Sequence, residues 1–208
     1  MPVPDRVAVL LDGEYLKKIL AQKLRRFPTE SDVMNEVRRT LEEPTLAGLT
    51  LYRIYYYTAE PFSGAAIHPL DGSRLDFAGT SIFSRNTQLI DRIENQPDVA
   101  VRRGTLVHQG WELGRAAVEE LLAGRKQNVE AGDVVPKILQ KGVDMRIGLD
   151  IAALALKRLV SVIVIVSGDS DLVPAMKLAR REGLRVYLDA LGNRHIRPEL
   201  KKHADRIV

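Results

Sequence analysis

Three aspartates follow two apolar segments that are typical of buried β-strands. Asp12 comes directly after the run Val7–Leu11, while Asp169 and Asp171 follow the run Val162–Val166 within the segment SGDSD. Continuous aliphatic runs of this length are characteristic of strands buried on both faces of a parallel sheet. The carboxyl ends of parallel strands lie at one edge of the sheet, where ligands bind. We therefore expect these three carboxylates to meet in space.

The segment KGVDMRIGLD adds two more acids, Asp144 and Asp150. The helix expected over residues 143–159 is apolar on almost every side, which indicates a buried helix, and a carboxylate there is costly without a partner. The two acids lie roughly 120° apart on an ideal helix, so they share a face only if the helix begins after Asp144 or deforms near Gly148. Clustered carboxylates repel unless a cation or a shared proton neutralises them. All-oxygen clusters suit Mg²⁺ or Mn²⁺.

Each acid also has a purely structural interpretation. An aspartate that follows a strand commonly caps the next helix, so Asp171 could simply cap the residues after it. Asp144 could cap its own helix, and Asp150 could be a buried acid with a satisfied partner. This interpretation fits the set less well than it fits any single residue, because SGDSD puts two acids in one tight turn.

The surrounding sequence predicts alternating strands and helices, which means parallel βαβ units. Loops are expected over 60–76 and in most of 110–135, and Thr29 or Ser31 can cap the second helix. Side-chain alternation separates Tyr55 and Tyr57 from Tyr56, which favours core packing over base stacking. The predicted strands are 6–12, 49–58, 99–107, 161–166, 184–188 and 205–208. The predicted helices are 14–24, a segment ending at 41, 78–95, 113–122, 143–159, 171–182 and 199–204.

The composition excludes several classes of protein. The 208 residues suit one domain with room for insertions. They include no cysteine, so disulfide scaffolds and thiolate sites are excluded. No segment has the form of a signal peptide or the length of a membrane span, and we expect a cytoplasmic protein. The net charge of +4 permits a nucleic-acid partner without requiring one. The sequence leaves the oligomeric state open.

In the order VAVLLDGE, KGVDMRIGLD, VSGDSDLVPAMKLARREGLRVYL and HADRIV, the sequence resembles the NYN domain of the LabA-like group, within the PIN-like nuclease superfamily. The resemblance covers most of the chain. It implies one domain over 1–208 with a PIN-like three-layer α/β/α sandwich around a mainly parallel central sheet. It also implies a ribonuclease that acts on RNA and uses Mg²⁺ or Mn²⁺. The residues that it assigns to metal binding and catalysis are Asp12, Asp144, Asp150, Asp169 and Asp171. Tyr15 departs from the family, which usually has Asn there.

The corresponding reaction is metal-assisted hydrolysis of a phosphodiester bond, in which the metal lowers the pKa of bound water and stabilises the departing oxygen. Candidate contacts for the RNA phosphates are hydroxyls near the acids and basic side chains, although each also fits an ordinary turn-forming or solvated role. These candidates are Ser167, Ser170, Lys17, Lys18, Arg102, Arg103 and Arg194.

Two other functions stay open. A regulatory protein could keep the acidic cluster, lack turnover and bind RNA or a protein partner, and Tyr15 favours that alternative. A phosphatase of the haloacid-dehalogenase type also places aspartates at strand ends, but it needs Asp-x-Asp after the first strand. Here Glu14 stands where its second aspartate belongs.

Overall fold

The computed structural model describes residues 5–193 and 195–208. The chain divides into two compact units, which are taken in turn. Unit 1 comprises Met1–Thr58, Leu89–Gly104 and Gly142–Val208, and unit 2 comprises Ala59–Gln88 and Thr105–Lys141. Within the described ranges, no helix combines the length and apolarity needed to cross a membrane.

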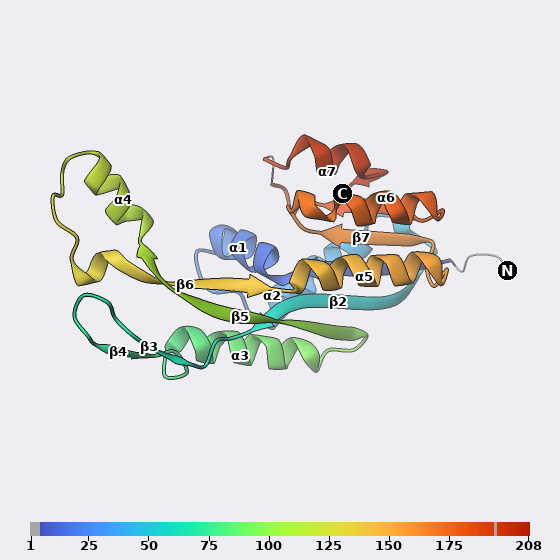
Figure 1. Ribbon diagram of the computed structural model, residues 1–208. Helices are drawn as coiled ribbons and strands as arrows, with labels where there is room; N and C mark the ends of the chain where they lie inside the picture. Colours follow the sequence, from blue (N-terminus) through green and yellow to red (C-terminus); the bar gives the residue numbers. More distant parts are fainter. Residues whose placement is uncertain (1–4, 194) are drawn as a thin grey trace. The chain divides into compact units, whose positions relative to one another are not determined.

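A seven-stranded sheet runs in the order β6-β5-β2-β1-β7-β8-β9. Figure 1 labels β6, β5, β2 and β7 of this sheet. The pairs β1–β2, β1–β7, β7–β8 and β8–β9 are parallel, whereas β5 and β6 are antiparallel. The expected mainly parallel α/β architecture is therefore confirmed. The strands are β1 Arg6–Asp12, β2 Thr50–Glu60, β5 Val99–Leu113, β6 Val134–Lys141, β7 Val162–Val166, β8 Arg185–Asp189 and β9 Arg206–Ile207.

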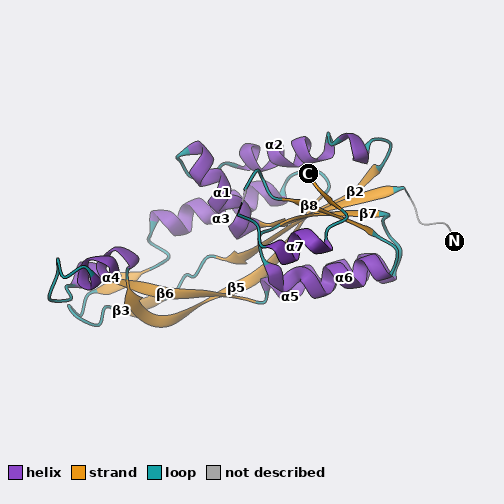
Figure 2. Cartoon of the chain, turned by 90° about the horizontal axis from the view of Figure 1, so that it is seen from above, coloured by secondary structure: helices purple, strands orange, loops and turns teal. Residues whose placement is uncertain are grey.

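Helices cover both faces of the parallel strands in unit 1. Figure 2 shows α1 and α2 on one side of these strands and α5 and α6 on the other, which gives the three layers expected from the resemblance. The α-helices are α1 Gly13–Leu24, α2 Glu30–Leu41, α3 Ser81–Glu94, α4 Arg115–Leu122, α5 Val143–Leu156, α6 Val173–Arg181 and α7 Pro198–His203. Short 3₁₀ turns lie at Pro44–Leu46, Ala131–Asp133 and Ser170–Leu172.

The core of unit 1 forms where β1 and β2 meet α1 and α2. Leu16, Leu20, Val33 and Val37 from the helices pack with strand residues that are almost completely buried. The predicted core packing of the tyrosine run is confirmed, because Tyr55, Tyr56 and Tyr57 are all buried.

The start of α1 lies very close to the end of β2. A Cβ atom on Gly13 would come within 2.6 Å of the backbone oxygen of Tyr57 and 2.8 Å of the Tyr56 ring. Glycine is the residue that permits such an approach between backbones. Gly13 therefore fixes how closely the first acidic turn lies against the sheet.

In unit 2, the expectation of a loop over 60–76 is wrong in part. Two short strands, β3 (Ala65–Ile67) and β4 (Arg74–Asp76), pair there as an antiparallel hairpin. The His68 ring closes the connection, because its Nδ1 accepts from the backbone N–H groups of Leu70 and Asp71. A turn stabilised by a side chain gives no hydrophobic periodicity, so the sequence pattern did not indicate it.

The expectation for residues 99–141 also needs correction. Strand β5 continues to Leu113 rather than ending near Val107, and its partner β6 was not expected at all. Pro136 lies inside β6 and pairs in register with Trp111, beside an irregularity in β5. A proline within a run argues against a strand, unless the strand lies at the edge of a sheet, as β6 does.

The structure identifies Thr29, rather than Ser31, as the cap of α2. The Thr29 hydroxyl accepts from the backbone N–H of Asp32 at 3.3 Å, and the Asp32 carboxylate accepts from the backbone N–H of Thr29 at 2.7 Å. The Ser31 hydroxyl instead donates to the Glu30 carboxylate at 3.2 Å.

We predict that Thr29→Ala lowers the free energy of unfolding by about 1 kcal/mol, the usual contribution of a helix cap. Ser31→Ala is the matched control and is expected to change it by less than about 0.5 kcal/mol. Urea unfolding of both variants measures the difference. Equal losses would show that the reciprocal Thr29–Asp32 pair does not stabilise the helix.

Candidate active site

Asp12 holds the junction between β1 and α1. One of its carboxylate oxygens accepts from the backbone N–H of Tyr15 at 3.1 Å, and the other accepts from the Ser167 hydroxyl at 2.9 Å. The parallel register pairs Leu11 with Val166, so Asp12 and Ser167 are the next residues on neighbouring strands. Asp12 therefore acts as the N-cap of α1 and also lies at the carboxyl edge of the sheet.

The turn after β7 is held together by its own side chains. The fully buried Ser167 hydroxyl accepts from the backbone N–H of Asp169 at 3.1 Å. Asp169 in turn accepts from the backbone N–H of Asp171 at 2.9 Å and caps the 3₁₀ turn Ser170–Leu172. Asp171 itself is exposed and does not cap α6. The turn thus presents two carboxylates beside Asp12.

Asp144 completes a group of four acids. It lies in the first turn of α5, and Gly142 takes the N-cap position that Asp144 could have held. Partial desolvation and the negative charges of Asp169 and Asp171 raise the pKa of the Asp144 carboxyl group. Burial raises the pKa of Asp12, with a contribution from Asp144, and outweighs the opposing hydrogen bonds from Tyr15 and Ser167.

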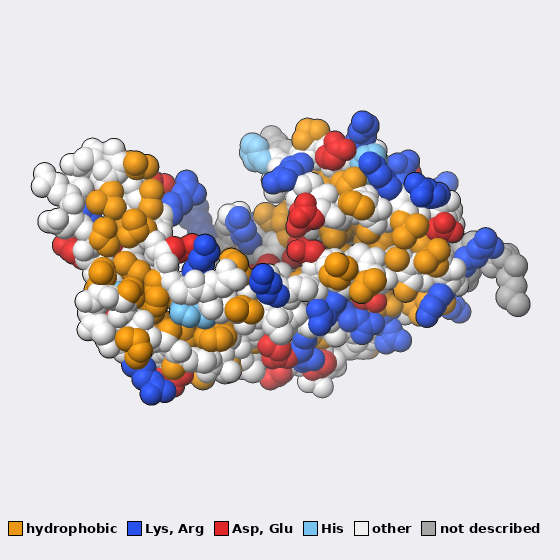
Figure 3. All heavy atoms as spheres, viewed as in Figure 1, with side chains coloured by type: hydrophobic (Ala, Val, Ile, Leu, Met, Phe, Trp, Pro, Cys, Tyr) orange, Lys and Arg blue, Asp and Glu red, His pale blue; other side chains and the backbone are white. Residues whose placement is uncertain are grey.

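Asp144 therefore lies within electrostatic reach of the other three acids. Figure 3 shows acidic side chains between the amino-terminal ends of α5 and α6, where Asp144 and Asp171 lie. A charge arrangement of this kind favours either protonation or a bound cation.

Asp150 has partners of a different kind. Its carboxylate accepts from the hydroxyl of the buried Tyr57 at 2.9 Å and from the Arg102 guanidinium at 3.0 Å. The Arg102 guanidinium also lies over the Tyr55 ring, 5.2 Å from its centre. Burial, together with the Asp150 charge and hydrogen bond, raises the pKa of Tyr57 above its usual range. The sequence predicted that burying the Asp150 carboxylate in α5 would cost free energy. The positive charge of Arg102 and the hydrogen bond from Tyr57 offset that cost.

The donor chemistry of the four-acid group fits a hard divalent cation, since every side chain offers carboxylate oxygen. A nearby cation would stabilise the charged forms of Asp12 and Asp144, whose pKa values are raised by burial and, to a smaller extent, by neighbouring acids. Among the described residues, however, no three acids or histidines already lie close enough to ligate one ion together. Mg²⁺ commonly keeps several waters and uses one or two protein carboxylates, which suits this spacing.

Tyr15 joins the two acidic turns to the loop after β8. Its hydroxyl donates to the backbone oxygen of Ala190 at 3.0 Å and accepts from the Asn193 amide at 3.4 Å. The Tyr15 ring lies against Gly168, where a Cβ atom would come within 2.6 Å of the ring. The residue that departs from the family pattern is therefore built into the site, next to Asp169.

Two residues at this edge were missed by the sequence analysis. Asp189 ends β8 and is fully buried, and its carboxylate accepts from Arg39 at 2.5 Å, Thr40 at 2.7 Å and the backbone N–H of Leu191 at 2.8 Å. Arg197 precedes α7 and donates to the Ser170 hydroxyl at 2.7 Å. The only sequence signal for Asp189 was its position after an apolar strand, and Arg197 had none.

Most of the basic candidates are held by acids outside the four-acid group. Lys17 pairs with Glu14, and both terminal nitrogens of Arg103 bind Glu94. Lys18 is exposed on α1, and Arg194 lies outside the described residues. The structure therefore brings Ser167 and Ser170 to the four-acid group, whereas Arg102 binds Asp150 and Arg103 binds Glu94.

Comparisons with known proteins agree with this architecture. The family model described as "NYN domain" matches residues 70–208. A crystal structure of a protein of unknown function from Vibrio parahaemolyticus RIMD 2210633 is similar over 100% of this chain and 94% of that one, with a TM-score of 0.51 and 12% identity, a likeness of fold alone. No curated protein matches the chain. Assignment to the LabA-like group rests on the motifs alone.

We predict that Asp189→Ala destabilises the protein by about 1–3 kcal/mol, because Asp189 is fully buried and its loss leaves the Thr40 hydroxyl and the backbone N–H of Leu191 without this acceptor. Glu36→Ala is the matched control. Glu36 binds the same Arg39 at 2.7 Å but is partly exposed, and its loss should cost less than about 1 kcal/mol. Denaturant unfolding compares the two. Similar losses would mean that the Asp189 network does not anchor this edge.

Proposed function

Because the chain belongs to the NYN-domain family, we propose that it is a divalent-metal-dependent ribonuclease. The NYN domain is part of the PIN-like nuclease superfamily. The observation that carries the proposal is the convergence of Asp12, Asp144, Asp169 and Asp171, two of which have raised pKa values, at the carboxyl edge of the parallel strands. Structural capping explains Asp12 and Asp169 singly, but it does not explain why four acids gather.

The proposal gives these residues distinct roles. Asp12, Asp144, Asp169 and Asp171 would hold Mg²⁺ or Mn²⁺, directly or through water. Such an ion supplies a water of lowered pKa and stabilises negative charge on the departing oxygen of the phosphodiester. Ser167 keeps Asp12 and the acidic turn in fixed relation through its two hydrogen bonds. Asp150, held by Tyr57 and Arg102, acts in this scheme by positioning α5 rather than by direct ligation.

Arg197 is the cation best placed to bind substrate. Its side chain is exposed, and it donates a hydrogen bond to Ser170, the residue between Asp169 and Asp171 in the acidic turn. Within the described ranges, its guanidinium pairs with no carboxylate, so several of its N–H donors remain for an anion. A guanidinium matches the geometry of phosphate oxygens. We assign to Arg197 the positioning of the RNA phosphate that is cut.

A second candidate function is a regulatory NYN-domain protein that binds RNA or a protein partner with weak or no turnover. Tyr15 favours it, because a large ring packed against Gly168 replaces a small amide beside the catalytic turn.

We also infer that the chain is one NYN domain in which unit 2 arises from insertions. Both segments of unit 2 interrupt unit 1, and the family match begins within the first of them and runs through the second.

We predict that the purified protein cleaves labelled single-stranded or structured RNA with Mg²⁺ or Mn²⁺ and not with EDTA. Asp169→Asn should reduce cleavage to the level of the EDTA reaction, because it removes a charge from the four-acid group. Asp91→Asn, the same change at an exposed position on α3, should leave the rate unchanged. If no RNA is cleaved with either metal while the protein still binds RNA, the ribonuclease proposal is refuted and the regulatory function is supported.

We further predict that Arg197→Ala raises the KM for RNA by about tenfold, consistent with the loss of a charged hydrogen bond worth about 1.5–3 kcal/mol. Arg197→Lys should recover part of the loss, since lysine keeps the charge but not the planar fork. Steady-state cleavage kinetics measure both, with Arg92→Ala on α3 as control. An unchanged KM for Arg197→Ala would remove this residue from substrate binding.

A further inference from the structure

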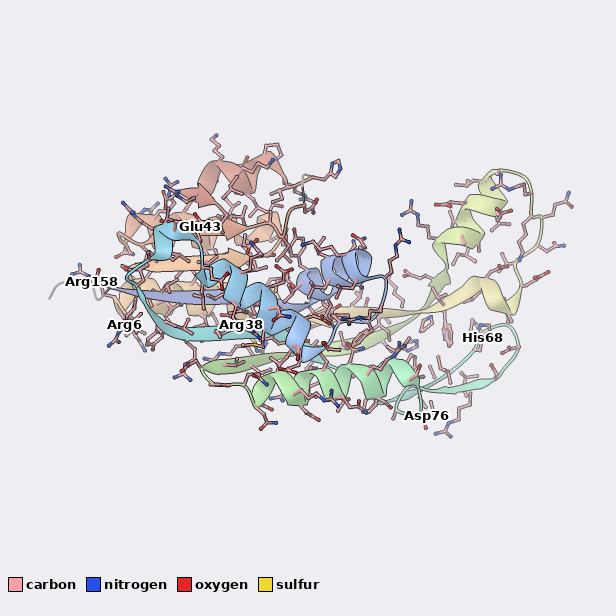
Figure 4. All side chains as sticks on the ribbon, turned by 180° about the vertical axis from the view of Figure 1, so that it is seen from behind. Arg6, Arg38, Glu43, His68, Asp76 and Arg158 are labelled. Carbon is pink, nitrogen blue, oxygen red and sulfur yellow. The ribbon has the colours of Figure 1, made fainter. Side chains whose placement is uncertain are left out.

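The edge of unit 1 opposite the aspartates is rich in arginine. Three of the parallel strands begin with this residue: Arg6 in β1, Arg185 in β8 and Arg206 in β9. Because these strands run in the same direction, Arg6 and Arg185 lie at the amino edge of the sheet, and Arg206, in the shorter β9, lies beside Tyr187, two residues further along β8. Figure 4 shows Arg6 and Arg158 at that end of unit 1. The parallel sheet thus separates acids at one edge from arginines at the other.

A surface depression of about 620 Å³ lies at this amino edge, entirely within unit 1. Its lining includes Arg180, Arg181, Arg185 and Arg206, and the one acid among the lining residues is Asp205. All four arginines are exposed. Figure 3 shows Lys and Arg side chains gathered over the carboxyl-terminal end of α6, which carries Arg180 and Arg181.

Asp205 offsets only one of these charges. One of its oxygens accepts from Arg180 at 2.8 Å, and the other accepts from the backbone N–H of Val186 at 2.8 Å. Both carboxylate oxygens are therefore in use inside the wall of the depression. In the part of the chain that the structure describes, Arg181, Arg185 and Arg206 make no ion pair with a carboxylate.

The strand register gathers the unpaired arginines on one face. Arg185 and Tyr187 are two residues apart, so their side chains point to the same face of the sheet. Arg206 pairs in register with Tyr187 and adds its side chain there. Arginines at the end of α6 also complement the helix dipole, but this effect does not account for the arginines that begin β8 and β9.

We propose that this arginine cluster, Arg181, Arg185 and Arg206, binds the phosphate backbone of an RNA chain at a second site remote from the aspartates. The guanidinium group suits phosphate oxygens. A mostly polar, solvent-exposed depression fits a polymer that continues beyond it, whereas sites for small ligands are usually enclosed and apolar. The proposal rests on the proposed function in taking RNA as the nucleic acid, but it does not require that the aspartates cut it.

The test is binding of labelled single-stranded RNA to the full-length protein in EDTA, where no metal-dependent cleavage interferes. The triple variant Arg181→Gln, Arg185→Gln, Arg206→Gln should bind about tenfold more weakly. Its slope of log affinity against log salt should fall by about 2, since each phosphate contact on a single strand contributes about 0.7. The control is Arg38→Gln, Arg74→Gln, Arg92→Gln, which removes the same charge from exposed positions elsewhere.

Equal affinities and slopes for the two triple variants would overturn the proposal, because the effect would then be one of net charge. It would also be overturned if the arginine-cluster variant lost thermal stabilisation by inorganic phosphate while keeping its RNA affinity, since the site would then hold a small anion. Arg206→Gln alone, with an expected slope change of about 0.7, serves if the triple variant does not fold. If the arginine-cluster variant alone loses RNA affinity and the unaltered protein cleaves no RNA, this second site is supported and the ribonuclease proposal is refuted.

Discussion

The parallel register of β1 against β7 is the constraint on which the rest of the site depends. Pairing Leu11 with Val166 makes Asp12 and Ser167 neighbours, and the 2.9 Å hydrogen bond between them joins the first turn to the SGDSD turn. A shift of one residue would turn every side chain of β1 to the other face and would separate Asp12 from Ser167, so the site exists only in this register. Once it is set, the acids of both turns must share one edge.

That arrangement has an electrostatic cost, which the structure offsets in different ways. Asp189 is compensated by Arg39, Thr40 and a backbone N–H group, and Asp150 by Arg102 and Tyr57. Among the described residues, the four-acid group around Asp12 has no such ion pair, and burial, with repulsion between acids added, raises the pKa values of Asp12 and Asp144. Paired acids stabilise the scaffold, whereas the unneutralised group is available for a cation. This contrast separates structural from candidate functional carboxylates more clearly than position in sequence does.

The same strand direction gives the sheet a charge polarity. Acids follow the carboxyl ends of β1, β7 and β8, and arginines begin β1, β8 and β9. A nucleic acid would be repelled by one edge unless a metal were bound there, and attracted by the other. The net charge of +4 hides this separation, because it sums two edges of opposite sign.

The sequence by itself determined the local features: the buried strands, the acid-bearing turns, the capped helix α2 and the family to which the motifs belong. These follow from interactions between residues close in the chain, such as Thr29 with Asp32. Only the tertiary structure decided which acids meet, because the partners of Asp150 and Asp189 lie far away in sequence. It also decided the hairpin of β3 and β4 and the strand β6, whose proline is tolerated only because no further strand pairs beyond it. Long-range pairing leaves little trace in local periodicity, and that is why the position of Arg197 and the arginine edge emerged only from the fold.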